Sequence, residues 1–140
     1  MNNSKVIGNS TEIHCITSFM DLGYNVSIPF GDCERYDFIA DCNGVLLRIQ
    51  CKTATIQDGG SSFLVNGRSS VKKNKKVSHR RYTKDEIDFF ATYFNSNCYL
   101  IPVEEMGSSK VLRIIPPKNY QKDRINLAED YLLENILKCN

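Results

Sequence analysis

The sequence predicts an α/β fold in which a mixed sheet is built around an early β-hairpin. Residues 36–53 have the pattern of two strands joined by Asn43-Gly44. This dipeptide is the strongest short-range signal for a two-residue hairpin turn, because both residues accept positive φ angles. Along the rest of the chain, the patterns indicate the order helix, three strands, basic excursion, helix, strand, strand, helix.

Length and composition indicate an ordinary folded domain. The chain has 140 residues, of which 41% are hydrophobic and 24% charged, so we expect one domain over residues 1–140 with a core of its own. The six cysteines form no C-x-x-C pair and no Cys/His spacing that suits zinc. With no signal-peptide pattern, and no apolar run near the roughly 18 residues of a membrane span, we expect a protein of the reducing cytoplasm.

The first elements are predicted to be a helix and a short strand. Residues from about Ile7 to Met20 read as a helix that ends near Gly23, a left-handed cap. Its expected apolar stripe consists of Ile13, Ile16, Phe19 and Met20. Tyr24 to Ile28 alternates like a strand, and residues 29–34 form a loop. Asp32 and Glu34 could be secondary metal or hydrogen-bond groups, but the loop favours turn residues.

Polar side chains gather at one end of the predicted hairpin. Asp37 lies on its first strand, while Gln50 and Lys52 lie two residues apart on the second and therefore on the same face. The neighbouring residues are mostly apolar, and burying polar groups without partners costs roughly 1–3 kcal/mol each. A bound divalent metal is a good explanation for such a group of polar side chains.

A basic excursion is expected at about residues 66–82. Phe63-Leu64-Val65 reads as a short strand and Asn66-Gly67 as a second hairpin-type turn, and no acidic residue occurs from Gly59 to Lys84. The segment that follows reads as an irregular loop, either merely solvated or a phosphate-binding arm that orders on DNA. Interleaved Ser, Asn, His and Tyr favour the second interpretation. The expected DNA contacts are Arg68, Ser69, Lys72, Lys73, Lys75, Lys76, His79, Arg80 and Arg81.

The C-terminal half is predicted to contain two helices and two strands. Thr83 and Glu86 form a capping-box pattern that predicts a helix running to about Phe94. Residues 98–103 read as a buried strand, which after this helix would complete a βαβ crossover and run parallel to an earlier strand. Residues 104–107 read as a turn, 111–115 as a strand, and Asn126 can cap a last helix that packs on the core or on a second copy.

The Asp-(x)n-Gln-x-Lys pattern on its hairpin resembles the PD-(D/E)xK nuclease superfamily. Further segments resemble, in order, the small group I intron-associated, homing-type branch of it: residues 8–12, 23–26, 29–32, 35–37, 48–53, 85–91 and 99–103. The resemblance covers nearly the whole chain. It implies a restriction-endonuclease-like αβββαβ core with a mixed sheet and a C-terminal strand-helix extension.

The resemblance also implies a catalytic site that holds Mg²⁺, for which Mn²⁺ can substitute. Asp37 would be the central ligand, with Glu12, the Gln50 amide and the Cys51 carbonyl as further ligands, while Lys52 would orient the attacking water and stabilise hydroxide. Considered alone, Glu12 could equally be a carboxylate that stabilises the helix dipole. The family pattern favours its role as a ligand.

Some residues depart from the usual pattern of the superfamily. Gln50 stands where Asp or Glu is usual, so its amide oxygen can coordinate the metal but lacks a charge, and the affinity for a second ion should fall. Tyr36 replaces the proline of the superfamily name, and Thr11 replaces the glycine that often precedes the helical glutamate. Glutamine at position 50 resembles the homing-type branch, so we interpret it as variation within an active family.

The resemblance implies a metal-dependent endonuclease that cleaves double-stranded DNA at specific sites. Since one small domain carries one active site, cutting both strands implies a homodimer or a higher homo-oligomer. The alternatives are a Holliday-junction resolvase, which usually has Glu at position 50, a non-catalytic nucleic-acid-binding module, and an interaction protein with a solvated basic loop. Of the two histidines, His14 is expected to be structural and His79 to contact phosphate.

Overall fold

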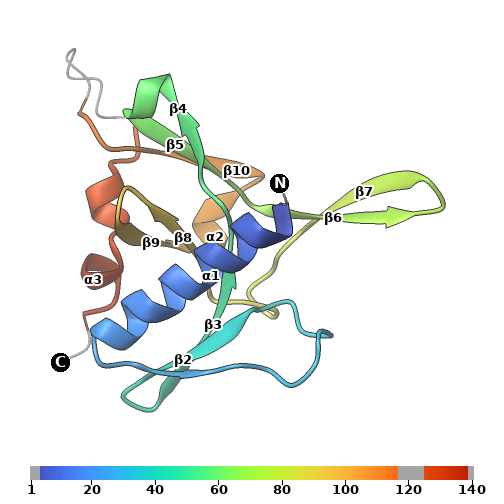
Figure 1. The fold of residues 1–140 in the computed structure, drawn as a ribbon, viewed down its shortest axis with the longest axis horizontal. Coiled ribbons are helices and arrows are strands. Elements are labelled where there is room, and N and C mark those ends of the chain that lie inside the picture. The colour runs from blue at the N-terminus through green and yellow to red at the C-terminus, as the bar shows by residue number, and fades with distance from the viewer. Residues whose placement is uncertain (1–3, 117–124, 139–140) are drawn as a thin grey trace.

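The computed structural model describes residues 4–116 and 125–138 and contains a mixed sheet covered by a long helix (Figure 1). The sheet has the strand order β1-β2-β3-β8-β9, in which β3 and β8 are parallel and the other neighbours antiparallel. The helix is α1 (Ser4–Asp21), and the strands are β1 (Asn25–Ser27), β2 (Phe38–Cys42), β3 (Val45–Cys51), β8 (Phe89–Phe94) and β9 (Asn97–Pro102). The predicted α/β class with a mixed sheet is confirmed.

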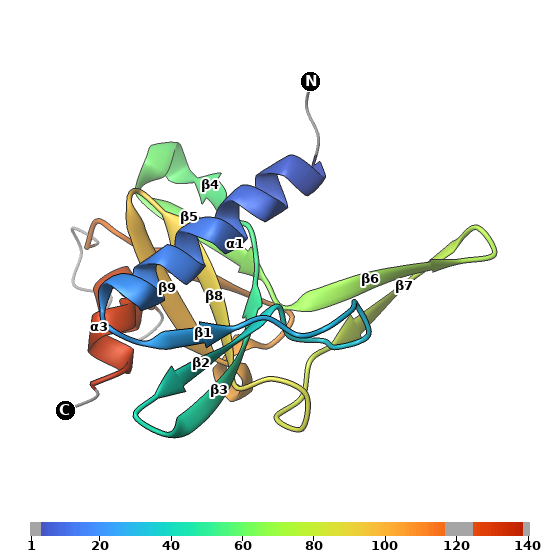
Figure 2. The ribbon, with the colours of Figure 1, turned by 60° about the horizontal axis from the view of Figure 1, so that its bottom comes forward.

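Smaller elements occupy the long connection between β3 and β8 and the C-terminal part of the chain. The strands β4 (Thr55–Gln57), β5 (Ser62–Asn66) and β10 (Ser109–Arg113) form a second sheet in the order β10-β5-β4. The strands β6 (Arg68–Lys73) and β7 (Lys76–Arg81) pair only with each other within the described residues, and their hairpin projects from the body of the molecule (Figures 1 and 2). The short helices are η1 (Asp58–Gly60), α2 (Val103–Met106), η2 (Ala128–Tyr131) and α3 (Leu133–Ile136).

Apolar side chains fill both faces of the large sheet. One buried cluster joins Cys15 and Phe19 of α1 to Phe38, Ile49 and their neighbours on the sheet. Another cluster joins the opposite face to the second sheet: Phe63, Val65, Ile87, Phe90, Tyr99, Ile101, Val103, Met106, Leu112 and Ala128. Phe38 of β2 and Ile49 of β3 belong to the first cluster, so packing against α1 holds both strands where they carry polar groups at one end.

Two-residue turns with positive φ angles connect several neighbouring strands. Asn43-Gly44 joins β2 to β3 as predicted, and Asn74-Lys75 and Asn95-Ser96 form equivalent turns that were not predicted. The predicted turn at Asn66-Gly67 is wrong, because the chain there continues from β5 into β6. Gly67 is buried instead, and a methyl group at its Cα would overlap the Met106 side chain and lie 2.7 Å from the Gly107 carbonyl oxygen.

The helix predicted after Thr83 is wrong beyond its first turn. The capping box does form, since the Thr83 backbone N–H and Oγ1 donate to Glu86 Oε1 at 3.1 and 3.2 Å, and the Ile87 N–H donates to the Thr83 carbonyl oxygen. Residues 89–94 then become β8, between β3 and β9. A central strand satisfies the backbone polar groups of the buried Phe90, Ala91 and Thr92 on both sides, which a helix at this place in the sheet could not do.

Other sequence-based expectations also need correction. Ile13 and Met20 are 62% and 59% exposed, because α1 packs on the sheet through Thr11, Cys15 and Phe19 instead. Residues 103–106 form a short helix rather than a turn, and the basic excursion is a regular hairpin rather than an irregular loop. The single last helix is replaced by η2 and α3, whose backbone is interrupted at Leu132.

None of the helices in residues 4–116 and 125–138 combines the length and the apolar character that a membrane crossing requires.

Candidate functional site

Asp37 is fixed at the point where β2 begins and β3 ends. Its backbone N–H donates to the Ile49 carbonyl oxygen at 2.7 Å, and its Oδ2 accepts a hydrogen bond from the Cys51 N–H at 2.8 Å. Because the two strands are antiparallel, the residue before β2 and the last residues of β3 share one edge of the sheet. The predicted gathering of Asp37 with Gln50–Lys52 is therefore found in the structure.

The helix α1 brings a second carboxylate to this edge. Thr11 is buried against the body of the molecule, and the next residue, Glu12, is half-buried. Burial raises the pKa of Glu12, and the negative charge of Asp37 raises it further. Two acidic side chains that are 25 residues apart in the sequence therefore interact electrostatically across the helix and the hairpin.

The electrostatic environment of these carboxylates suits a divalent cation. Burial also raises the pKa of Asp37, although the hydrogen bond from Cys51 and the positive charge of Lys52 act in the opposite direction. Two partly desolvated carboxylates repel each other when both are ionised, and a cation between them would remove that cost. Oxygen donors of this kind are the ligands that Mg²⁺ prefers.

Further oxygen donors lie at the end of β3. Gln50 Nε2 is 3.5 Å from the Cys51 carbonyl oxygen, so the Gln50 amide and that carbonyl face the same region. In the part of the chain that the structure describes, no three or more His, Cys, Asp or Glu side chains gather as potential metal ligands. A metal at this edge would thus combine the two carboxylates with amide or backbone oxygens and water.

Lys52 extends from the end of β3 toward the β6–β7 hairpin. Its Nζ donates to the Arg68 carbonyl oxygen at 2.9 Å and lies 5.1 Å from the centre of the Tyr82 ring. Burial lowers the pKa of Lys52; the charge of Asp37 opposes this shift, and the charge of Arg35 adds to it. The ammonium group is thus in contact with the root of the hairpin and within electrostatic range of Asp37.

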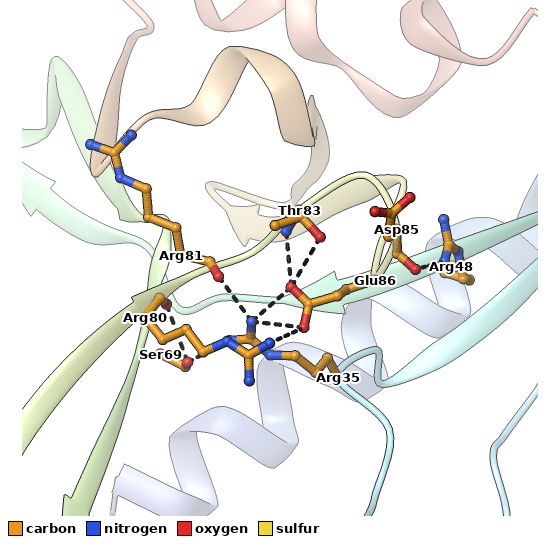
Figure 3. A network of polar contacts seen from close by, with 8 residues as sticks. All are labelled: Arg35, Arg48, Ser69, Arg80, Arg81, Thr83, Asp85 and Glu86. Atoms are coloured by element: carbon orange, nitrogen blue, oxygen red, sulfur yellow. Dashed lines mark hydrogen bonds and ion pairs between the residues drawn. The ribbon is translucent and has the colours of Figure 1, made fainter.

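A network of polar contacts joins this edge to the hairpin (Figure 3). Arg35 Nη1 donates to Glu86 Oε1 at 2.9 Å and to the Arg81 carbonyl oxygen at 2.9 Å, while Nη2 donates to Ser69 Oγ. Arg80 Nη2 donates to the other oxygen of Glu86 at 2.9 Å. Burial acts to raise the pKa of Glu86, but these arginines and the Thr83 N–H hold it below its usual value, so the carboxylate stays ionised.

A second arginine holds the segment that leads into β8. Arg48 of β3 pairs with Asp88 at 3.1 Å and donates to the carbonyl oxygens of Lys84 and Asp85, each at 2.6 Å. The backbone N–H of Arg48 also donates to Asp88 Oδ2 at 2.8 Å. This clamp keeps the capping-box turn, and with it Glu86, against the strand that carries the polar groups.

The residues expected to contact DNA fall into an outer and an inner group. Lys73, Lys75, Lys76 and His79 are exposed on the outer part of the hairpin, and His79 Nδ1 lies 3.3 Å from Ser70 Oγ. At the root, Arg80 binds Glu86, Ser69 binds Arg35, and Arg81 Nη2 donates to Ser108 Oγ at 2.8 Å. Arg68 Nε is buried without a hydrogen-bond partner among the described residues, and the side chain of Lys72 lies outside them.

Comparison with protein families gives one decisive match. The model of a family described as PD-(D/E)XK endonuclease matches residues 2–134. This chain belongs to the PD-(D/E)XK endonuclease family. The fold and family that the hairpin motif predicted are thereby confirmed, and the protein is a nuclease.

The fold of this endonuclease is also found in a solved structure. It is similar to that of a bacterial homing endonuclease, I-Ssp6803I, with a TM-score of 0.75 and 22% sequence identity over 94% of this chain and 89% of that chain. No curated protein sequence matches the endonuclease significantly. At this level of identity, the likeness to the solved structure establishes the common fold.

Three residues of the endonuclease stand out in the structure although the sequence did not assign them to the site; Glu86 was expected only as part of a capping box. Arg35, Tyr82 and Glu86 connect the edge that carries Asp37 and Lys52 to the hairpin. Arg35 precedes Asp37 by two residues, but both lie in the irregular backbone before β2, so strand alternation does not relate their side chains. Its partner Glu86 is 51 residues away, and nothing in the local sequence indicates that pairing.

Proposed function

We propose that this endonuclease hydrolyses phosphodiester bonds of double-stranded DNA with Mg²⁺, or with Mn²⁺ in its place. The observation that carries the proposal is the edge where backbone hydrogen bonds fix Asp37 at the end of β3, with Glu12 of α1 and Lys52 in electrostatic range of it. Glu12, Asp37, the Gln50 amide and the Cys51 carbonyl would hold the cation. When bound, a divalent cation neutralises charge on the scissile phosphate and lowers the pKa of the attacking water.

The protein's own groups then have distinct tasks. The Cys51 N–H fixes the orientation of Asp37, so that the free lone pairs of the carboxylate are directed consistently. Lys52 is partly withdrawn from water beside Asp37, where a positive charge stabilises the negative charge that develops during hydrolysis. Because Glu12 and Asp37 must be ionised to act as ligands and both have raised pKa values, cation binding should strengthen as the pH rises from acid to neutral.

The β6–β7 hairpin is the proposed DNA-recognition element. A two-stranded ribbon has the dimensions to enter the major groove, where base pairs are distinguishable. Exposed lysines around the Asn74-Lys75 turn supply positive charge for the phosphates: Lys73, Lys75 and Lys76. Base contacts from such a ribbon would support site-specific cleavage of the homing type.

Cleavage of both strands requires two active sites. The chain contributes one set of Glu12, Asp37 and Lys52, so we propose a homodimer or a higher homo-oligomer on DNA.

The test is cleavage of a plasmid that carries either the native-locus sequence or a randomised insert. Wild type is compared with Asp37→Ala and Lys52→Ala in Mg²⁺, Mn²⁺ and EDTA, and DNA binding is followed by fluorescence anisotropy. We expect metal-dependent cleavage by wild type and a loss on the order of 100-fold or more in either variant, with DNA affinity retained in Lys52→Ala.

Asp130→Ala removes an exposed carboxylate at the other end of the chain and serves as the matched control, with wild-type cleavage expected. Salt-dependent DNA binding without cleavage by any variant would favour a non-catalytic binding module. Equal cleavage by wild type and Asp37→Ala would refute the assignment of the site.

A further inference from the structure

Arg35 makes contact with both strands at the root of the hairpin. Its Nη2 donates to Ser69 Oγ on β6, and its Nη1 donates to the Arg81 carbonyl oxygen on β7 at 2.9 Å. Ser69 Oγ in turn donates to the Arg80 carbonyl oxygen at 3.3 Å. One guanidinium group therefore bridges the two strands at the place where the hairpin leaves the body of the molecule (Figure 3).

Arg35 is also held by a group outside the hairpin. Glu86 accepts hydrogen bonds from Arg35 Nη1 at 2.9 and 3.1 Å, and Glu86 itself is held by the backbone N–H of Thr83. The side chains of Arg35 and Glu86 are only 19% and 18% exposed. A partly buried ion pair that also bonds to backbone groups has one preferred geometry, so it can act as a rigid connection.

Lys52 contacts the direct sequence neighbours of the two residues that Arg35 binds on the hairpin. Lys52 Nζ donates to the carbonyl oxygen of Arg68, which directly precedes Ser69, and it lies over the ring of Tyr82, which directly follows Arg81. The guanidinium carbon of Arg35 lies 3.8 Å from the centre of the same ring. Tyr82 packs edge-on against the buried Phe90, which anchors the ring in the core.

We propose that Arg35 is a positioning residue for Lys52: by tying the hairpin root to the segment that carries Asp37, it sets where the Lys52 ammonium rests. The proposal rests on the proposed function and links the catalytic edge to the DNA-recognition hairpin. Because the Tyr82 ring is anchored by Phe90, a displacement of the hairpin root would move the Arg68 carbonyl oxygen, and with it the lysine, relative to that ring. The placement of Lys52 relative to Asp37 therefore depends on how the hairpin is held, and DNA bound by the hairpin acts on the same root.

The experiment compares Arg35→Lys and Arg35→Gln with wild type. Lysine keeps the charge, but its single ammonium cannot bridge Ser69, the Arg81 carbonyl and Glu86 as a planar guanidinium does. We expect both variants to lose roughly 10- to 100-fold in the single-turnover cleavage rate at saturating protein, since small misplacements of catalytic groups have effects of this size. The DNA dissociation constant should stay within about threefold of wild type, because Arg35 is turned inward.

A spectroscopic measurement separates positioning from general loosening. The ¹⁵N signal of the Lys52 ammonium is assigned by its absence in Lys52→Arg, and in wild type it should differ from the signals of exposed lysines because it is hydrogen-bonded and lies over a ring. In Arg35→Lys it should move toward the exposed lysines at unchanged melting temperature. Arg113→Lys, an arginine whose Nε donates to the Ile115 carbonyl oxygen, is the matched control and should change neither signal nor rate.

Should an Arg35 variant not fold, Ser69→Ala removes the contact between Arg35 and β6 together with the weaker bond from Ser69 Oγ to the Arg80 carbonyl oxygen. It leaves the Arg35 contacts with Glu86 and the Arg81 carbonyl oxygen in place and should show the same changes to a smaller degree. Wild-type rates and an unchanged Lys52 signal in a folded Arg35→Lys protein would overturn the positioning role and leave the nuclease function intact. A different result is also informative: wild type shows no metal-dependent cleavage, but the Lys52 signal still changes when Arg35 is substituted. That result would overturn the proposed function and the catalytic significance of the link.

Discussion

At the scale of single residues, Asp37 is placed where its charge costs stability and would serve the proposed cation. Burial raises its pKa, and only the Cys51 N–H and Lys52 act against that rise. Glu12 is in a similar position, because the charge of Asp37 adds to its own burial. Functional sites commonly retain such groups at a cost to folding. A cation bound between the carboxylates would relieve both shifts.

Replacement of Asp37 by asparagine should therefore stabilise the metal-free protein while it abolishes cleavage. The folded pKa of Asp37 lies above its unfolded value, so the stabilisation from its protonated form is complete at low pH and is lost as the pH rises through the folded pKa. We expect Asp37→Asn to melt above wild type at neutral pH in EDTA, with the difference disappearing in acid. Differential scanning fluorimetry over this pH range measures the effect.

The control for that prediction is Asp130→Asn, which changes an exposed carboxylate and should follow wild type at every pH. Added Mg²⁺ should raise the melting temperature of wild type and of Asp130→Asn, but not that of Asp37→Asn. If Asp37→Asn melts with or below wild type in EDTA at neutral pH, the carboxylate is not destabilising and the description of the site is wrong.

The residues of the site differ in how well the sequence could predict them. Asp37, Gln50 and Lys52 could be placed because the Asn43-Gly44 turn fixes the register of β2 and β3, and strand alternation then fixes the faces. Arg35 and Glu86 meet across 51 residues of sequence. Their contact depends on the path of the whole connection between β3 and β8, which no local pattern encodes.

At the scale of elements, local sequence patterns predicted the correct secondary structure only where that structure was compatible with pairing in the sheet. The Thr83–Glu86 capping box forms as the sequence predicts, but the helical conformation continues for only one turn. From Phe89 to Phe94 the sequence is aromatic, with a β-branched threonine, and favours a strand, and Asn95-Ser96 supplies a hairpin turn. The position between β3 and β9 decides the outcome, because tertiary pairing outweighs helix propensity.

At Asn66-Gly67 the sequence has the pattern of a turn, but the structure uses the glycine for close packing instead. Replacing Gly67 with alanine should destabilise the protein by about 1–3 kcal/mol, the usual cost of forcing extra atoms into a packed site. The added methyl group would collide with Met106 and press on the Gly107 carbonyl oxygen. Urea unfolding measures the change.

Gly8→Ala is the matched substitution and should raise the free energy of unfolding instead of lowering it. Gly8 lies within α1 with no atom near its would-be Cβ, so alanine should stabilise the helix by up to about 1 kcal/mol. If Gly67→Ala were as stable as wild type, the close approach between β6 and α2 would be wrong.

The hairpin as an element should dominate the salt dependence of DNA binding. Changing Lys73, Lys75 and Lys76 together to glutamine should lower the slope of log Kobs against log salt by about 2.7, because each lost phosphate contact contributes about 0.9. Fluorescence anisotropy with duplex DNA at several salt concentrations gives the slope. Lys110→Gln, on β10, should leave it unchanged. A slope that is unaffected by the triple change would show that the hairpin tip does not contact phosphates.

At the scale of the whole molecule, the outer face of α1 presents apolar side chains to solvent. Val6, Ile13 and Met20 are 62%, 62% and 59% exposed, and their spacing of seven residues places them on one stripe of the helix. The opposite stripe of α1, with Cys15 and Phe19, covers the sheet. Since the proposed cleavage of both strands would need two active sites, we expect this stripe to contact a second copy of the chain.

Ile13→Glu combined with Met20→Glu should therefore weaken self-association without unfolding the protein. In sedimentation velocity the double variant should shift toward the monomer, and with plasmid it should nick single strands more readily than it linearises. Ile56→Glu, at a residue of β4 that is 63% exposed, is the control and should behave as wild type. An unchanged sedimentation profile would show that any assembly uses another surface.

The β6–β7 hairpin begins and ends at paired residues, Arg68 and Arg81, and contributes no strand to the other sheets of the described chain. Its outer part, residues 71–78, can therefore be exchanged for another segment without changing the rest of the fold. Cutting between the paired residues Ser70 and His79 leaves chain ends that are already neighbours, so a replacement turn of a few residues closes with little loss of entropy. New recognition ribbons could then evolve, or be engineered, by insertion at this point, while the root that meets Arg35 and Lys52 stays as it is.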